Sequence, residues 1–153
     1  MSTTKRFWRF SLLCAVAILA LVASSCSSDS PTGLDPNLVS QGQTVYQANC
    51  MRCHGAQGEG QPNWKVQNPD KTYPPPPHDS TGHTWHHPDG VLYRIVRDGG
   101  IIYEDPGFKS GMPTFGTQLK PEEIRAVLTY IKTFWTQEQR ELQAAASKQD
   151  PFP

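Results

Sequence analysis

The sequence predicts an all-α protein in which a few short helices are joined by long loops. Apolar residues recur at helical spacing near residues 36–50, 88–98 and 121–135, whereas strand signals are nearly absent beyond the short run 101–103. Only 37% of the 153 residues are hydrophobic, and 14 residues are proline. This composition allows one domain with a small core and argues against a large multi-strand enzyme.

The first 25 residues have the layout of a secretory signal peptide. Lys5, Arg6 and Arg9 make a positive start, residues 10–23 are almost uninterruptedly apolar, and two serines follow. The apolar run is shorter than the ~20 residues that a spanning helix needs. An uncleaved N-terminal anchor is the alternative interpretation of this segment. Without the leader, 11 basic residues face all 14 acidic ones, a net charge of −3. This balance argues against a nucleic-acid binder, which needs a basic patch.

Cys26 follows the leader directly, and residues 23–26, Ala-Ser-Ser-Cys, resemble the bacterial lipobox. In that motif the cysteine becomes the lipidated first residue of the mature chain. Residues 26–36 are mostly small and polar, which is typical of a flexible tether. We therefore predict a lipid anchor at Cys26 and a place in the periplasm or on the outer face of the cytoplasmic membrane. An exported soluble protein with an incidental Cys26 is the alternative.

The predicted helices begin and end at recognisable residues. Asp35 and Pro36 provide an N-cap and a first-turn proline for a helix that runs to about Cys50. Pro88 opens a second helix, and the glycines at 99–100 end it. The clearest helix starts at residues 121–123 with two acids in its first turn, and its apolar residues share one face: Ile124, Val127, Leu128, Ile131, Phe134 and Trp135. Residues 136–153 form a polar C-terminal extension with a candidate exposed helix over 136–147.

Residues 50–54, Cys-Met-Arg-Cys-His, form a C-x-x-C-H motif, the attachment pattern of c-type haem. Two thiols three residues apart at a helix end can each add across one vinyl group of the same porphyrin, and His54 is then carried under the iron as an axial ligand. A cofactor held at two carbons needs little core, which agrees with the low apolar fraction and the long loop at 55–90. We predict one haem c, bound covalently by Cys50 and Cys53.

Three other interpretations of the motif compete with haem. A thioredoxin-like redox pair needs strands that alternate with helices, and a zinc site needs a fourth ligand such as His83, His86 or His87. A C-x-x-C disulfide closes too small a loop to constrain much of the unfolded chain. The cysteine count favours haem, because Cys14 leaves with the leader and Cys26 takes lipid, so no free thiol remains in an oxidising compartment.

A haem iron has either a second axial ligand or an open position, and Met112 is the leading candidate for the ligand. Pro113 restricts Met112 to an extended backbone in a loop just before the last predicted helix. Met51 lies inside the attachment motif and cannot reach across the ring. A histidine ligand is the competing possibility, and the candidates for it are His78, His83, His86 and His87.

With these motifs the chain resembles the class I, single-haem c-type cytochromes of bacteria over about residues 38–135, and we assign residues 37–135 to such a domain. The resemblance implies a cytochrome c fold, with three to four short helices wrapped around one haem and long loops rich in proline and glycine. Gly42 and Tyr46 match the family's small and aromatic pair on the first helix. The positions that they would cross on the last helix are Val127 and Tyr130.

The resemblance also implies a proline whose carbonyl oxygen accepts a hydrogen bond from Nδ1 of the axial histidine. Pro76 is the first choice for this role and Pro62 the second. The chain departs from the family at His78, where an apolar residue is common, and in the histidine-rich run 83–87. A metal site such as copper in that run is a minor alternative.

With His54 and Met112 both bound, the iron has no free position, so we predict neither catalysis nor a small-molecule substrate at the iron. The expected function is one-electron transfer between redox partner proteins of a respiratory chain, through weak and transient docking. Two alternatives stay open. One is a haem-bearing subunit of a larger respiratory or dehydrogenase complex, and the other is a sensor or enzyme with a five-coordinate haem.

Overall fold

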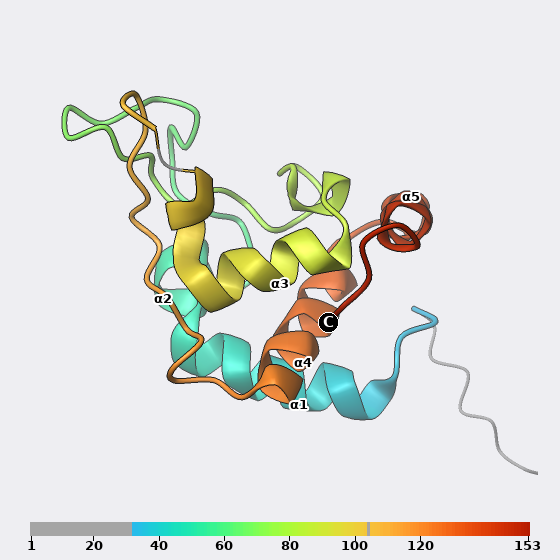
Figure 1. Cartoon of the computed structure of the whole chain (residues 1–153). Coiled ribbons are helices and arrows are strands. Elements are labelled where there is room, and N and C mark those ends of the chain that lie inside the picture. Colours follow the sequence, from blue (N-terminus) through green and yellow to red (C-terminus); the bar gives the residue numbers. More distant parts are fainter. Residues whose placement is uncertain (1–31, 104) are drawn as a thin grey trace, which may run out of the picture.

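The computed structural model describes residues 32–103 and 105–153, and this part of the chain is helical (Figure 1). It contains α1 (Pro36–Asn49), α2 (Met51–His54), α3 (Asp89–Asp98), α4 (Pro121–Ile131) and α5 (Gln137–Ser147), with three short 3₁₀ helices between them. The predicted all-α fold is confirmed, although α-helices outnumber the expected three to four because α2 forms a separate turn after α1. The predicted signal peptide, Cys26 and the start of the predicted tether lie outside the described residues.

No helix in the described part of the chain is long and apolar enough to span a membrane. The short run 101–103 is not a strand, because it belongs to the 3₁₀ helix η2 (Gly99–Tyr103). Within the described residues, β-type pairing is limited to one isolated antiparallel bridge between Asp105 and Phe108. In the described part of the chain, helices and loops therefore surround the core.

Helix α1 begins as its sequence predicts and leads directly into the C-x-x-C-H motif. The Asp35 carboxylate accepts a hydrogen bond of 2.8 Å from the backbone N–H of Asn37, which caps the helix. At the other end the backbone N–H of Cys50 donates to the Tyr46 carbonyl, and the Cys50 carbonyl accepts from the His54 N–H. The motif is therefore a continuation of α1, and its side chains take their directions from that helix.

Helices α1 and α4 cross in close contact at Gly42. A Cβ atom on Gly42 would lie 2.0 Å from the carbonyl oxygen of Ala126 and 2.8 Å from Cβ of Tyr130. One turn later on α1, the ring of Tyr46 packs on that of Tyr130 with 5.4 Å between their centroids. The family resemblance paired this site with Val127 and Tyr130. The contact with Tyr130 is present, whereas the carbonyl that faces Gly42 belongs to Ala126.

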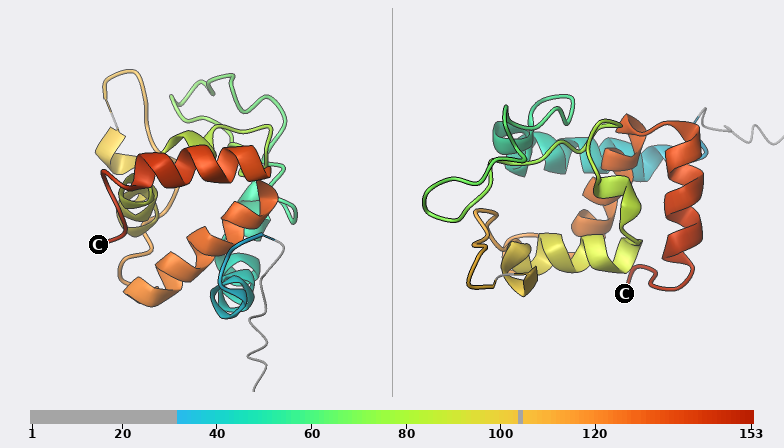
Figure 2. Two further views of the ribbon diagram at one scale, coloured as in Figure 1. Left: turned by 90° about the vertical axis from the view of Figure 1, so that its right-hand side faces the viewer. Right: turned by 90° about the horizontal axis from the view of Figure 1, so that it is seen from above.

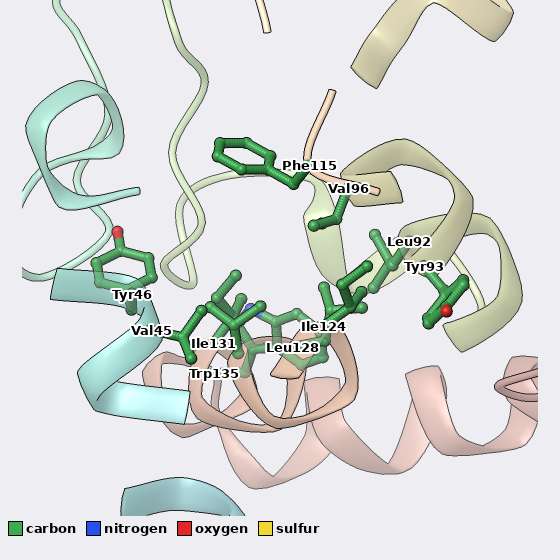
Figure 3. Packing of buried hydrophobic residues seen from close by; sticks show 11 residues of the cluster. Val45, Tyr46, Leu92, Tyr93, Val96, Phe115, Ile124, Leu128, Ile131 and Trp135 are labelled. Atoms are coloured by element: carbon green, nitrogen blue, oxygen red, sulfur yellow. The ribbon is translucent and has the colours of Figure 1, made fainter. Parts of the chain in front are cut away.

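The core lies among α1, α3 and α4 (Figure 3). Helix α4 contributes most because its predicted apolar face points inward, and the helix ends at Ile131 before a 3₁₀ turn, η3 (Lys132–Phe134). Phe134, which the same pattern includes, is only partly buried at the edge. The buried apolar cluster consists of Val45, Tyr46, Leu92, Tyr93, Val96, Phe115, Ile124, Val127, Leu128, Ile131 and Trp135.

Helix α5 covers one end of the molecule, opposite the first part of the long loop that follows the motif (Figure 2). Thr136 caps it, since its hydroxyl accepts a hydrogen bond from the backbone N–H of Gln139. Gln143 is only 1% exposed and donates to the Asp89 carboxylate at 2.7 Å, and the Ser147 hydroxyl accepts from the Asp89 N–H at 3.0 Å. The candidate exposed helix is thus anchored through buried polar side chains, a kind of packing that apolar periodicity does not reveal.

Candidate haem site

The two cysteines of the motif lie at the junction of α1 and α2. Cys50 is half-buried and contacts the core cluster, Cys53 is exposed, and neither forms a disulfide. Burial raises the pKa of the Cys50 thiol to about 11, so this thiol is protonated at neutral pH. Both sulfur atoms are therefore available for thioether bonds, and the structure gives no support to the disulfide interpretation.

His54 is the buried member of the motif, and its ring has a defined partner. Its Nδ1 lies 2.9 Å from the carbonyl oxygen of Pro76, and the residue is 8% exposed. A carbonyl oxygen only accepts, so Nδ1 carries the proton and the lone pair is on Nε2. Burial lowers the pKa of His54, which favours the neutral ring. This is the arrangement of an imidazole that binds a metal through Nε2, and the carbonyl comes from Pro76 rather than from Pro62.

A close backbone approach brings the proline run onto the motif. Gly60 donates its N–H to the His54 carbonyl at 2.8 Å, and a Cβ atom on Gly60 would lie only 2.5 Å from the Pro77 nitrogen. The φ of Gly60 is +68°, a conformation that glycine adopts without strain. The N–H of Gln61 then donates to the Pro75 carbonyl at 2.9 Å. These contacts hold Pro76 with its carbonyl toward His54.

Met112 lies on the loop that connects η2 to α4, and this loop is docked on the end of α3. The N–H groups of Phe115 and Gly116 donate to the carbonyls of Val96 and Arg97 at 3.1 and 2.8 Å. Met112 itself is partly buried against the same apolar cluster that Cys50 contacts. The fold therefore brings the thioether and the attachment motif, which are far apart in the sequence, to one shared core.

The residues at this core fit a c-type haem. The donor set comprises two free thiols, a buried imidazole with its lone pair on Nε2, and a partly buried thioether. Partly buried apolar side chains pack against the same cluster, namely Trp85, Leu119, Tyr130 and Phe134. Soft sulfur and imidazole ligands in apolar surroundings are those that haem iron takes in cytochromes.

A comparison with protein families decides the class of this site, because the Cytochrome c family model matches residues 39–135. The chain belongs to the cytochrome c family. Membership confirms the predicted haem c, which such a domain binds covalently. It also indicates an electron-transfer haem protein, and members of this family are typically carriers rather than enzymes. No curated protein and no solved structure matches the chain significantly.

The histidines of the run 83–87 in this cytochrome contact aromatic side chains. The ring of His83 stacks on Trp64 with 5.6 Å between centroids and meets the ring of His87 edge to face, while His86 contacts Trp85. Among residues 32–103 and 105–153, no group of three or more His, Cys, Asp or Glu side chains is arranged to hold a metal ion. The structure thus gives no support to the zinc and copper interpretations.

Two residues near His54 in this cytochrome have contacts that the sequence did not predict, and one of them, His78, is a candidate for the competing histidine ligand. The ring of His78 stacks on His54, and Nδ1 of His78 lies 2.9 Å from the Thr84 hydroxyl. His78 departs from the family pattern, and this departure is the signal in the sequence that marks it. Nothing in the local sequence marks Thr84, because its contact with His78 depends on how the loop folds back.

Proposed function

We propose that this protein is a class I bacterial c-type cytochrome that carries single electrons between partner proteins of a respiratory chain. It is lipid-anchored at Cys26, in the periplasm or on the outer face of the cytoplasmic membrane. The observation that carries the proposal is the hydrogen bond between Nδ1 of the buried His54 and the Pro76 carbonyl, which leaves Nε2 for iron. Family membership supplies the haem.

The second part of the proposal is that His54 and Met112 would be the two axial ligands of the haem iron. The partial burial of Met112 against the core cluster supports it. When bound, the haem supplies a centre that accepts and releases one electron. The chain would supply His54 and Met112 as the ligands, and a methionine ligand raises the reduction potential.

The place of the motif along α1 agrees with anchoring at the N-terminus. The 14 residues of α1 span about 21 Å at the usual helical rise. The tether enters at the first residue of this helix, and Cys50 follows its last residue. A lipid at Cys26 would therefore leave the haem end of the domain away from the anchor and open to redox partners.

Ligation by Met112 is tested with Met112→Ala. We expect the ferric variant to lose the weak red absorption band of a methionine-ligated haem, and the ferrous variant to bind carbon monoxide. Met51→Ala is the matched control, because Met51 is 40% exposed within the motif, and it should keep the wild-type spectrum. A wild-type ferrous protein that takes up carbon monoxide readily would instead support a five-coordinate sensor or enzyme.

The anchor is tested separately with Cys26→Ser. We expect this variant to move from the membrane fraction to the soluble periplasmic fraction and to lose the mass of the lipid. Cys14→Ser, which changes a cysteine within the leader, should stay in the membrane fraction. Membrane association that persists in Cys26→Ser would contradict the lipid anchor, and co-purification with other chains at high salt would support a fixed subunit of a complex.

A further inference from the structure

The ring of His54 is contacted on one face by the ring of His78. Their centroids are 4.0 Å apart and their planes are inclined by only 22°. A single hydrogen bond to Pro76 fixes the position of Nδ1 in His54 but leaves rotation of the ring about the hydrogen-bond axis. A flat ring against the face of His54 restricts that rotation. His78 therefore supplies a constraint that the Pro76 carbonyl cannot.

The orientation of His78 is in turn set by Thr84. The Thr84 hydroxyl lies 2.9 Å from Nδ1 of His78 and donates to the Pro77 carbonyl at 3.4 Å. Thr84 is 6% exposed, so water has little access to this pair. The hydrogen bond between Nδ1 of His78 and the Thr84 hydroxyl holds the imidazole in one orientation.

The segment that carries His78 and Thr84 is fastened from the C-terminal side of the chain. The indole N–H of Trp135 donates to the His78 carbonyl at 2.8 Å. On α5, Gln139 donates to the Ser80 carbonyl at 3.0 Å, and Gln143 donates to a carbonyl at the end of the same segment, that of residue 87. Gln139 and Gln143 lie beyond the residues that the family model matches. Helix α5 thus supports the segment at its middle and end, and Trp135 at its start.

We propose that His78 is a positioning residue for His54, and that Thr84, supported by α5, sets the orientation of His78. Together with the Pro76 carbonyl, the His78 ring holds the plane of the axial imidazole in one direction relative to the haem. This inference rests on the proposed ligation of iron by His54. Through the segment that carries His78 and Thr84, α5 would then influence the orientation of the axial imidazole and so the electronic structure of the haem.

The readout is the proton NMR spectrum of the ferric holoprotein, in which the spread of the haem methyl shifts depends on the direction of the axial imidazole plane. Thr84→Val keeps the shape of the side chain and removes the hydroxyl, so we expect at least one haem methyl resonance to move by more than its line width. Thr84→Ser keeps the hydroxyl and should restore the wild-type pattern.

Thr129→Val is the matched control, because Thr129 is 7% exposed in α4 and its hydroxyl donates to the Arg125 carbonyl. It removes a comparable buried hydroxyl away from His78, so its methyl pattern should equal that of the wild type. A wild-type pattern in Thr84→Val would overturn the inference. So would a pattern in Thr84→Ser that is changed as much as in Thr84→Val, because the change would then not follow the loss of the hydroxyl.

A second variant keeps the test decisive if Thr84→Val does not yield folded holoprotein. His78→Gln removes the flat ring and retains an amide that can reach the Thr84 hydroxyl, and we expect it to change the methyl pattern. An unchanged pattern would overturn the inference. Wild-type protein without signals of an iron-bound imidazole would overturn the proposed ligation itself, and this inference with it, so the two failures are distinguishable.

Discussion

The phenol of Tyr46 donates a hydrogen bond of 2.8 Å to the carbonyl of Gly55, the residue directly after His54. Tyr46 is fully buried and its ring also packs on Tyr130 and Phe134, so it belongs to the contact between the first helix and the C-terminal part of the domain. The same side chain therefore joins the helix crossing to the end of the haem-attachment motif. Stability of the core and geometry of the site are coupled through it.

Tyr46→Phe should lower the free energy of unfolding by about 1–3 kcal/mol, because it removes the donor and leaves a shielded carbonyl without its partner. The measurement is denaturant unfolding of the holoprotein. Tyr73→Phe is the matched control, since Tyr73 is 41% exposed, and its effect should stay within about 0.5 kcal/mol. Equal effects of the two substitutions would contradict this role of the buried hydroxyl.

The same residue predicts a loss of stability at alkaline pH. Burial raises the pKa of Tyr46 well above its ordinary value of 10.0. The folded state therefore keeps a proton that the unfolded state releases, so this contribution is complete below pH 10.0 and declines as the pH rises above it. The expected slope is at most about 1.4 kcal/mol per pH unit. Unfolding measured across this range should show a shallower decline in Tyr46→Phe, and an identical decline would contradict the prediction.

Gly42→Ala should destabilise the protein by about 1–3 kcal/mol or more, because the added methyl group meets backbone atoms of α4 that cannot move aside alone. The obstacle is the Ala126 carbonyl oxygen at 2.0 Å from the Cβ position. Gln43→Ala, at the neighbouring exposed position of α1, is the control and should change stability by about 0.5 kcal/mol at most. Thermal or denaturant unfolding of both variants is the measurement, and a stabilised Gly42→Ala would refute the close crossing.

Replacement of the two motif cysteines by serine should remove covalent haem stepwise. Each single variant, Cys50→Ser or Cys53→Ser, keeps one sulfur and should hold haem through one thioether bond. The double variant should release all haem under denaturing conditions, because a hydroxyl does not replace the thiol in this linkage. Mass spectrometry of the denatured chain is the measurement. Haem mass retained by the double variant would contradict attachment at these two residues.

Asp89→Asn should destabilise the protein by about 3–5 kcal/mol, because it leaves the Lys132 ammonium largely buried without its counter-charge. These side chains are 13% and 12% exposed, and Lys132 Nζ lies 2.6 Å from the Asp89 carboxylate. Asp150→Asn is the matched control, since it breaks a more exposed pair with Arg94 and should cost about 1 kcal/mol or less. Denaturant unfolding of both variants is the measurement. A similar loss of unfolding free energy in Asp89→Asn and Asp150→Asn would contradict the prediction that burial makes the Asp89 pair more important for stability.

The helices and the attachment motif could be predicted because both depend on neighbours in the chain. Asp35 caps α1 and Pro121 opens α4 through local backbone geometry, and the apolar face of α4 follows from helical periodicity. The spacing of Cys50, Cys53 and His54 places three reactive groups on one turn of helix. These features depend on residues that are close together in the chain, so they can be predicted from a single sequence.

The choice of Pro76 needed a family resemblance, and the rest of the site needed the folded chain. Which carbonyl meets His54, and which ring stacks on it, depends on how Gly60 admits the proline run and how Trp135 and α5 hold the following segment. Thr84 acquires a partner only in this arrangement. The sequence by itself therefore determined the helices and the groups that attach the cofactor. Only the tertiary structure decided the surroundings of His54, because contacts between distant segments depend on chain paths that local patterns do not encode.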